Sequence, residues 1–100
     1  MAADPVIVDP KHYKVEFEND RVRVLRIRYG PHEKSPMHWH PANIVVMLSD
    51  CDFCFYLPKD IKQDILGHVG QVLCVEEPYE HAPENLSNKV FEAICVELKK

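Results

Sequence analysis

Long apolar runs are missing from this chain of 100 residues. No run approaches the roughly 18 residues that a membrane-spanning helix needs, so we expect no membrane span. The first ten residues, MAADPVIVDP, contain neither the basic stretch nor the apolar stretch of a secretory signal. Together these two absences predict a cytoplasmic protein.

An excess of positive charge is missing as well. The chain has 12 Lys and Arg against 16 Asp and Glu, a formal net charge of −4, and the two signs are interspersed. Proteins that bind nucleic acids carry a basic patch or stripe that neutralises phosphates. We therefore expect no nucleic-acid partner.

The 4 cysteines offer no clear framework for disulfides or zinc. Without an export signal, free thiols are the expected state. Cys51 and Cys54 form a C-x-x-C motif, but no helix follows it to lower a thiol pKa, and residues i and i+3 of a strand face opposite sides. No second such motif completes a zinc site, so we expect inert thiols here. Cys74 and Cys95 lie in apolar runs and are expected in the core.

Amphipathic helical periodicity is absent, and short β-rich runs separated by turn residues take its place. Their number and their roughly ten-residue spacing are typical of a jelly roll. Neither a linker nor an internal repeat divides the chain, so we expect one domain over residues 1–100. The expected strands are 13–18, 21–29, 37–40, 43–48, 51–57, 62–66, 71–76 and 90–98.

Two local features refine this picture. In the run 21–29, Val22 and Val24 share one phase of the strand whereas Leu25 and Ile27 share the other. Such a switch predicts a β-bulge in this strand. The apolar run 6–8 is expected to be an edge strand that can pair with a neighbouring sheet.

Histidines provide the first sign of chemistry. His38 and His40 stand two residues apart, so on a strand both side chains point to the same face and can converge on one ion. Imidazole is a common ligand of zinc, iron, nickel and manganese. The alternative is that both histidines are polar residues on a solvated sheet face. Trp39 faces the opposite side, where it is expected to pack.

Two longer motifs resemble the signatures of the cupin superfamily. The stretch 29–41, YGPHEKSPMHWHP, resembles the first signature, Pro-Gly-x-x-x-Pro-x-His-x-His-Pro, which a Glu and a strand follow. The stretch from Gly70 resembles the second, because His81 follows Gly70 by eleven residues and Asn85 follows His81 by four. The whole chain is similar to very small, stand-alone bacterial cupins. The resemblance implies an all-β fold, the double-stranded β-helix or jelly-roll barrel, with about eight to ten short antiparallel strands.

The resemblance also implies that His38, His40 and His81 hold a divalent metal ion, such as iron, zinc, nickel or manganese. Cupins usually add a Glu shortly after the second histidine, but residues 41–48 contain no carboxylate. Asn43 lies nearest to that position, one residue early, and is a candidate fourth ligand through its neutral amide oxygen. Two alternatives follow: a three-histidine site with open positions, as in the thiol dioxygenase branch, or a pocket that has lost tight metal binding.

The polar residues near His81 and in the turns can be interpreted as functional or as structural. Four carboxylates are close to His81 in sequence, and they either accept a hydrogen bond from its second ring nitrogen or belong to a solvated loop. Asn85 is expected to bond to the local backbone, and the remaining histidines are expected in exposed turns. The carboxylates are Glu76, Glu77, Glu80 and Glu84, and the turn histidines are His12, His32 and His68.

The sequence is compatible with three functions. The first is a metalloenzyme of dioxygenase or isomerase type that acts on a small polar substrate. The second is a non-catalytic module that binds or senses a small molecule. The third is a structural homodimer with a vestigial pocket, since the resemblance implies homodimers. Fold alone does not decide among them.

Overall fold

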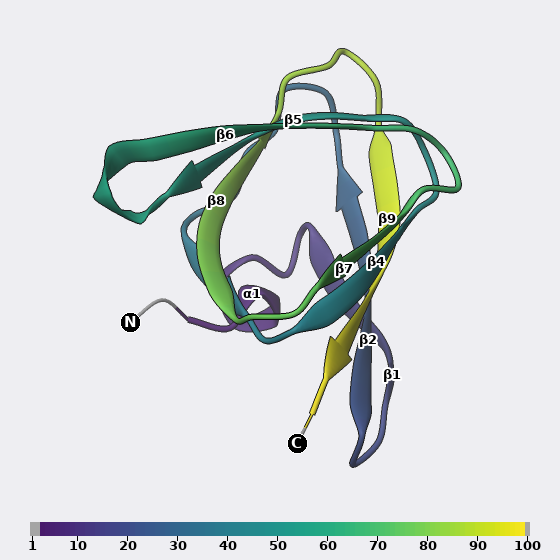
Figure 1. The fold of residues 1–100 in the computed structure, drawn as a ribbon. Helices are drawn as coiled ribbons and strands as arrows, with labels where there is room; N and C mark the ends of the chain where they lie inside the picture. Colours follow the sequence, from purple (N-terminus) through teal and green to yellow (C-terminus); the bar gives the residue numbers. More distant parts are fainter. Residues whose placement is uncertain (1–2, 100) are drawn as a thin grey trace.

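The computed structural model describes residues 3–99 and consists almost entirely of β-strands (Figure 1). Neither helix in this part of the chain is long and apolar enough to cross a membrane. In chain order the elements are α1 (Pro5–Val8), β1 (Tyr13–Glu18), β2 (Val22–Tyr29), β3 (His38–His40), β4 (Asn43–Met47), β5 (Cys51–Leu57), the 3-10 turn η1 (Pro58–Asp60), β6 (Ile61–Gly67), β7 (Val72–Val75), β8 (Tyr79–Asn85) and β9 (Phe91–Leu98).

The strands form two antiparallel sheets. The first has five strands in the order β1-β2-β9-β4-β7, and the second has four in the order β3-β8-β5-β6. Neighbours in each sheet are mostly far apart in sequence, as in a double-stranded β-helix. In Figure 1 the β5–β6 hairpin reaches out to one side of the molecule. The predicted all-β jelly-roll class is confirmed.

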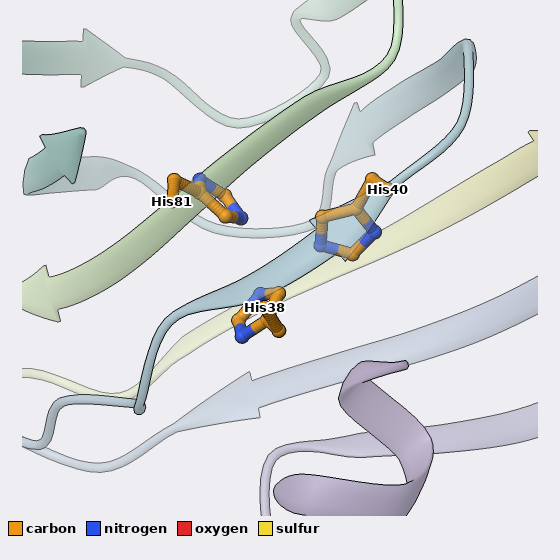
Figure 2. A group of neighbouring side chains, drawn as sticks. All are labelled: His38, His40 and His81. Atoms are coloured by element: carbon orange, nitrogen blue, oxygen red, sulfur yellow. The ribbon is translucent and has the colours of Figure 1, made fainter. Parts of the chain in front are cut away.

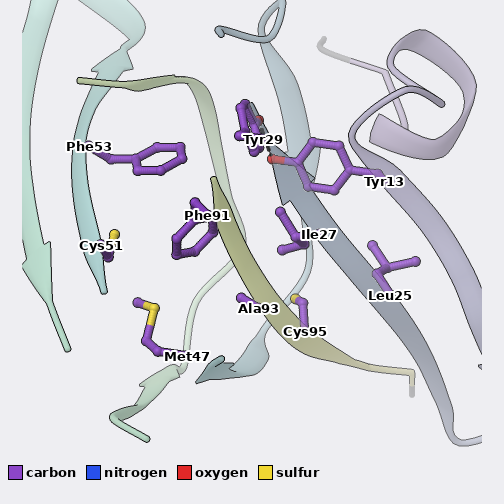
Figure 3. Close-up of a cluster of buried hydrophobic side chains, with 10 residues drawn as sticks. All are labelled: Tyr13, Leu25, Ile27, Tyr29, Met47, Cys51, Phe53, Phe91, Ala93 and Cys95. Atoms are coloured by element: carbon purple, nitrogen blue, oxygen red, sulfur yellow. Dashed lines mark hydrogen bonds between the residues drawn. The ribbon is translucent and has the colours of Figure 1, made fainter. Parts of the chain in front are cut away.

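The core lies between the two sheets and follows the two-residue period of the strands. Leu25, Ile27 and Tyr29 point inward from β2, and the neighbouring strand β9 contributes alternate residues in the same way. Figure 3 shows the cluster, in which the hydroxyls of the two tyrosines are hydrogen-bonded. Its members are Tyr13, Leu25, Ile27, Tyr29, Met47, Cys51, Phe53, Phe91, Ala93 and Cys95.

A β-bulge is present, but in β1 instead of the predicted strand. The register of β1 against β2 shifts between Val15 and Phe17, while β2 pairs continuously with β9. The apparent change of phase in β2 arises because Val24 lies on the outward face and a charged residue, Arg23, takes an inward position beside Leu25. A half-buried arginine hid the true alternation of this strand.

The predicted strand at 6–8 is wrong, because these residues form α1. Asp4 caps the helix, its carboxylate accepting a hydrogen bond of 2.9 Å from the backbone amide of Val6. Pro5 occupies the first turn, where its fixed φ suits a helix and its missing N–H costs nothing. The capping residue and the proline together outweigh the strand preference of the β-branched residues that follow.

Strand β8 is the element that the sequence analysis missed. It contains Pro83, which removes a backbone donor and normally argues against a strand inside a sheet. Here Pro83 pairs with Phe55 of β5, and its carbonyl accepts a hydrogen bond from the amide of Ser35 at 2.9 Å. The strand therefore keeps its place although one residue cannot donate.

All four cysteines are free. Cys51 and Cys54 are buried, and Cys95 is in the core as predicted. Cys74 is exposed, which corrects the expectation that it belongs to the core. It pairs with Ile44 on the outward face of the five-stranded sheet, which no other element of residues 3–99 covers.

The histidines outside the cupin-like signatures divide into two kinds. His32 and His68 are exposed, as predicted. His12 is buried, and the expectation of an exposed turn is wrong. Its ring stacks on Tyr29 at 4.1 Å between centroids, and its two nitrogens lie 2.7 Å from Asp9 and 2.9 Å from Glu33. Two carboxylates and one aromatic face enclose this ring, which makes it a structural residue.

Replacement of Leu25 by Ala tests the core. Leu25 is 0% exposed, so the loss of its side chain leaves a cavity between the sheets. We expect Leu25→Ala to lower the free energy of unfolding by about 2–5 kcal/mol, measured by urea denaturation. The control is Leu66→Ala, at a position that is 74% exposed, where the change should stay within about 0.5 kcal/mol. Equal losses in the two variants would contradict this assignment of the core.

Candidate metal centre

Three histidines meet where β3 pairs with β8. His38 and His40 point inward from β3, as their two-residue spacing predicts, and His81 lies directly opposite His38 in the register of β8 (Figure 2). The exposed fractions of the three side chains are 0%, 2% and 3%. The solvated-face alternative for the histidine pair is therefore excluded. Trp39 points away from the cluster, as expected, but it is exposed, so the expectation that it packs is not confirmed.

The geometry of the cluster suits one ion. The ring nitrogens of His38, His40 and His81 that can serve as ligands all lie within 4.8 Å of one another. Nε2 of His38 and both ring nitrogens of His81 are buried and lack any hydrogen-bond partner. A buried polar group without a partner costs about 1–3 kcal/mol. A divalent ion bound by three imidazoles would satisfy such nitrogens, and this donor set is known from catalytic zinc sites.

The protonation state of the cluster favours metal binding. Burial and the nearby His40 lower the pKa of His38 to about 4. Burial, with His40 and His38 nearby, holds the pKa of His81 well below its usual range. Both rings are thus neutral at physiological pH, and the neutral imidazole is the form that coordinates a metal.

Backbone and hydroxyl groups fix the orientation of His38. Its Nδ1 lies 2.9 Å from the carbonyl oxygen of Pro36 and 3.2 Å from Oγ of Ser35. A carbonyl only accepts, so Nδ1 carries the proton and donates it. The lone pair is then on Nε2, the atom that has no partner in the cluster.

A buried carboxylate performs the same task for His40. Oε2 of Glu97, on β9, lies 2.9 Å from Nδ1 of His40, and Oε1 accepts a hydrogen bond of 2.8 Å from Nε of Arg23. Arg23 in turn donates to Asp4, the residue that caps α1. Glu97 is only 3% exposed. Its negative charge is thus paired with the guanidinium of Arg23, and it accepts the Nδ1 proton of His40 in a hydrogen bond, which leaves the lone pair of this ring on Nε2.

Sequence reasoning missed Glu97, although a signal was present. The inward positions of β9 read Phe91, Ala93, Cys95, Glu97, so a carboxylate occupies the fourth place of a buried series. Of the four glutamates expected near His81, none is hydrogen-bonded to that ring, since both of its nitrogens lack a partner. The hypothesis that one of these glutamates accepts a hydrogen bond from His81 is therefore wrong. Glu84 instead accepts a hydrogen bond of 2.8 Å from the hydroxyl of Tyr56.

A cavity of 440 Å³ adjoins the cluster, and His40 and His81 form part of its wall. Most of the other lining side chains are aliphatic or aromatic, which favours a more apolar ligand than the polar substrate expected from the sequence. Cys51 and Cys95 also line the cavity. Burial raises the pKa of these thiols to about 11 and about 12, so both stay protonated and are poor metal ligands at neutral pH.

Comparisons with known proteins agree with this architecture. Neither a protein-family model nor a curated protein matches the chain. Among solved structures, a cupin domain from Bordetella pertussis superposes with a TM-score of 0.81 at 24% identity over 88% of this chain and 92% of that one. A cupin superfamily protein from Desulfitobacterium hafniense gives a TM-score of 0.63 at 17% identity over 88% of this chain and 76% of that one. The chain has the cupin fold.

A third solved structure with this fold is the polyketide cyclase RemF from Streptomyces resistomycificus. It superposes with a TM-score of 0.63 at 13% identity, over 88% of this chain and 64% of that one. At these identities the likeness concerns the cupin fold alone. The resemblance inferred from the signature motifs at residues 29–41 and 70–85 is confirmed at this level, and the chemistry must be argued from the site itself.

Asn43 contacts Tyr79, whose ring lies against His40 and His81, but it has a different environment from the histidines. It is 0% exposed, and its amide nitrogen donates to the carbonyl of Pro41 at 2.9 Å and to the hydroxyl of Tyr79 at 3.4 Å. Its side-chain oxygen has no partner. The amide oxygen is thus free of competing bonds, and Asn43 as a fourth ligand stays a prediction. Asn85 behaves as predicted, donating to the carbonyls of Gly30 and Lys89.

Replacement of Glu97 by Gln tests the orientation of His40. The amide removes the negative charge between His40 and Arg23, whose side chain is 15% exposed. We expect a loss of about 1–3 kcal/mol in the free energy of unfolding. We also expect zinc affinity to fall roughly 10- to 100-fold, because such supporting carboxylates tune the ligand that they contact. Chemical denaturation and competition with a zinc chelator measure the two effects.

Glu92→Gln is the matched control on the same strand. Glu92 faces outward and pairs loosely with Arg26 at 3.7 Å, where both side chains are more than a third exposed. We expect little change in stability or zinc affinity from this substitution. Unaltered zinc affinity in Glu97→Gln would overturn the role assigned to Glu97.

Proposed function

We propose that this cupin binds one divalent metal ion through His38, His40 and His81 and presents it to a small molecule in the adjoining cavity. The observation that carries the proposal is the set of buried ring nitrogens without partners. A protein interior normally satisfies its buried polar groups. Three such atoms in one cluster therefore favour a ligand that the histidines share.

The chain's own residues define what this site can do. Two of the three histidines line the cavity, so a molecule there meets the cluster directly. Tyr79 lies on the same wall, and burial raises the pKa of its hydroxyl to about 12, so it stays protonated. An ion held by the histidines supplies Lewis-acid or redox chemistry. The apolar walls limit the entry of bulk water, which strengthens hydrogen bonds to a bound molecule.

A non-catalytic module for binding a small molecule is the second candidate. The neutral Asn43 near the place where cupins usually have a Glu favours it, because a neutral amide binds divalent ions more weakly than a carboxylate. In addition, Glu77 is the one carboxylate among the described residues of the cavity wall, so candidates for a general acid or base are few. The two candidates differ in turnover: the metalloenzyme consumes its ligand and the module does not.

The metal content of untagged protein tests the first candidate. We expect close to one divalent ion per chain after incubation with zinc, iron, nickel or manganese, and loss of the ion in His38→Ala/His40→Ala. Elemental analysis measures both, and zinc should raise the melting temperature of the native chain only.

The matched control for this experiment is His68→Ala. His68 is exposed and distant from the cluster in the β6–β7 turn, so this variant should keep its metal. Native chain that takes up no metal under any of these conditions would overturn the proposal and leave the binding module. Retention of metal by the double variant would show that the ion binds elsewhere.

We further propose that the chain forms a homodimer through the outward face of the five-stranded sheet. The cross-strand register places an apolar row there that crosses all five strands. An antiparallel sheet with one solvated face normally carries polar residues on it. The outward apolar residues are Phe17, Val22, Val24, Ile44, Val46, Val72, Ile94, Val96 and Leu98, together with Cys74.

The size of this face supports a second copy as its occupant. Ten side chains on one face span roughly 300 Å², from the spacing of strands and residues in a sheet. One partner of a stable complex contributes about 800 Å², and the side chains around them can supply the remainder. This face replaces the edge strand at 6–8 as the proposed dimer contact, since those residues are helical. Free thiols throughout the chain agree with the cytoplasm as the proposed location.

Cys74 is a built-in reporter of this dimer. It is exposed in the single chain and lies on the apolar face, whereas Cys51, Cys54 and Cys95 are buried and serve as internal controls. We expect its alkylation to slow as protein concentration rises, by mass action, and light scattering to show twice the mass of one chain. In Ile44→Lys, both effects should vanish. A monomeric mass at about 100 µM protein would overturn the proposal.

A further inference from the structure

The walls of the cavity carry little charge. Among the described residues that line it there is no Lys or Arg, and the one carboxylate, Glu77, is exposed. The nearby guanidinium of Arg23 is already engaged by Glu97 and Asp4 and is not part of the wall. A buried carboxylate or phosphate on a ligand would thus lack a cationic side chain, and an unpaired buried charge is strongly unfavourable.

Aromatic rings form much of the cavity surface. Phe53 packs against Phe91 with ring centroids 4.7 Å apart, and Phe55 meets the ring of His81 edge to face at 4.3 Å. Figure 3 shows Phe53 and Phe91 facing each other from β5 and β9. Rings in these orientations offer both edges and faces to a flat molecule. The cavity thus suits a planar apolar body.

The volume limits the size of that body. A cavity of about 150 Å³ accommodates benzene, and this one measures 440 Å³. It has room for one or two fused rings with small substituents. The volume also lies toward the lower end of the roughly 300–1,000 Å³ range of small-molecule sites, which argues against a peptide or a nucleotide.

The hydroxyl of Tyr79 can donate beside the histidines. The hydroxyls of Tyr13 and Tyr29 bond to each other at 2.7 Å, which uses one of their two protons. The oxygen of Tyr79 accepts a hydrogen bond from the amide of Asn43 at 3.4 Å, which leaves its own proton for another acceptor. Its ring centroid lies 4.9 Å from that of His81 and 5.5 Å from that of His40. An oxygen on the ligand can therefore accept a hydrogen bond from Tyr79 beside the histidines.

We infer that the ligand is a neutral, largely apolar molecule of one or two rings whose single oxygen-bearing head group, a phenol, enol or ketone, faces Tyr79 and the histidines. The position of the head group rests on the proposed function, since a bound ion would meet it there. The preference for an uncharged ring body rests on the cavity walls alone. Tyr79 is then the residue that selects an oxygen-bearing head group.

The test compares two probes of nearly equal size, 2-naphthol and 2-naphthoate. At pH 7 the first is neutral and the second carries a negative charge. We expect the metal-free native chain, prepared with a chelator, to bind 2-naphthol at least about tenfold more tightly than 2-naphthoate, because the anion has no partner on the wall. Isothermal titration calorimetry measures both affinities. Equal or tighter binding of the naphthoate would overturn the inference.

Two variants, with one control, test whether 2-naphthol binds in the cavity. Ile65 lines it and Leu66, the next residue of β6, is exposed, so Ile65→Trp should abolish 2-naphthol binding while Leu66→Trp keeps it. Tyr79→Phe removes only the hydroxyl and should weaken 2-naphthol by roughly 2- to 12-fold, the value of one neutral hydrogen bond. Binding of 2-naphthol that survives in folded Ile65→Trp, or is unchanged in Tyr79→Phe, would overturn the inference. If Ile65→Trp does not fold, the comparison of the two probes on the native chain decides.

Zinc separates this inference from the proposed function. Native chain that takes up no zinc but discriminates between the two probes would overturn the metal site and leave the ligand class standing. Native chain that binds zinc but shows no preference for 2-naphthol in its metal-free form would do the reverse. The two results are independent, because the discriminating measurement is made without metal.

Discussion

The register between β3 and β8 is the constraint on which the rest of the site depends. It places His38 directly opposite His81 and brings His40 to the same face two residues later. Because side chains alternate across a strand, a slip of one residue would turn the histidines of one strand away from the other. The register is held from outside the pair as well, since Ser35 donates to the carbonyl of Pro83 and Trp39 donates to that of Ala3. A three-residue strand such as β3 needs these additional bonds to stay in place.

The charged groups that are bonded to His40 and to its partners are not part of the cavity wall. Behind His40, Glu97 is held between the imidazole and Arg23, and Arg23 reaches Asp4 at the start of α1. In front of it, the cavity wall is apolar and aromatic. Buried ion pairs contribute little net stability because desolvation offsets their attraction. The network is better understood as a device that orients His40, and α1 takes part in the site through its capping residue.

Much of the fold and of the site was predictable from the sequence, for identifiable reasons. The spacing of His38, His40 and His81 within two signature motifs indicated both the fold and the cluster. On a strand, residues two positions apart point to the same face, so this spacing alone brings His38 and His40 together. The features that the sequence did not predict depend on partners that are distant in sequence. Glu97 lies 57 residues from His40, His12 is buried by Glu33, and β8 survives Pro83 only because two neighbouring strands enclose it. The alternation of β2 was not predictable at Arg23, since nothing local distinguishes a half-buried, paired arginine from an exposed one.

The features that destabilise the free protein are the ones that would favour the binding of a ligand. Three unpaired ring nitrogens and an unpaired amide oxygen are buried together, and each costs free energy that the surrounding core must offset. The aromatic packing of Phe53, Phe91 and Tyr29 around a rigid double sheet provides that stability. Because the sheets fix the rings, the site need not reorganise when a ligand binds, which lowers the cost of binding. Ligand binding would then stabilise the folded state, because the ligand would satisfy groups that are unpaired in the free protein. A site built in this way is held in place by its strands and is left incomplete at the buried ring nitrogens and at the amide oxygen.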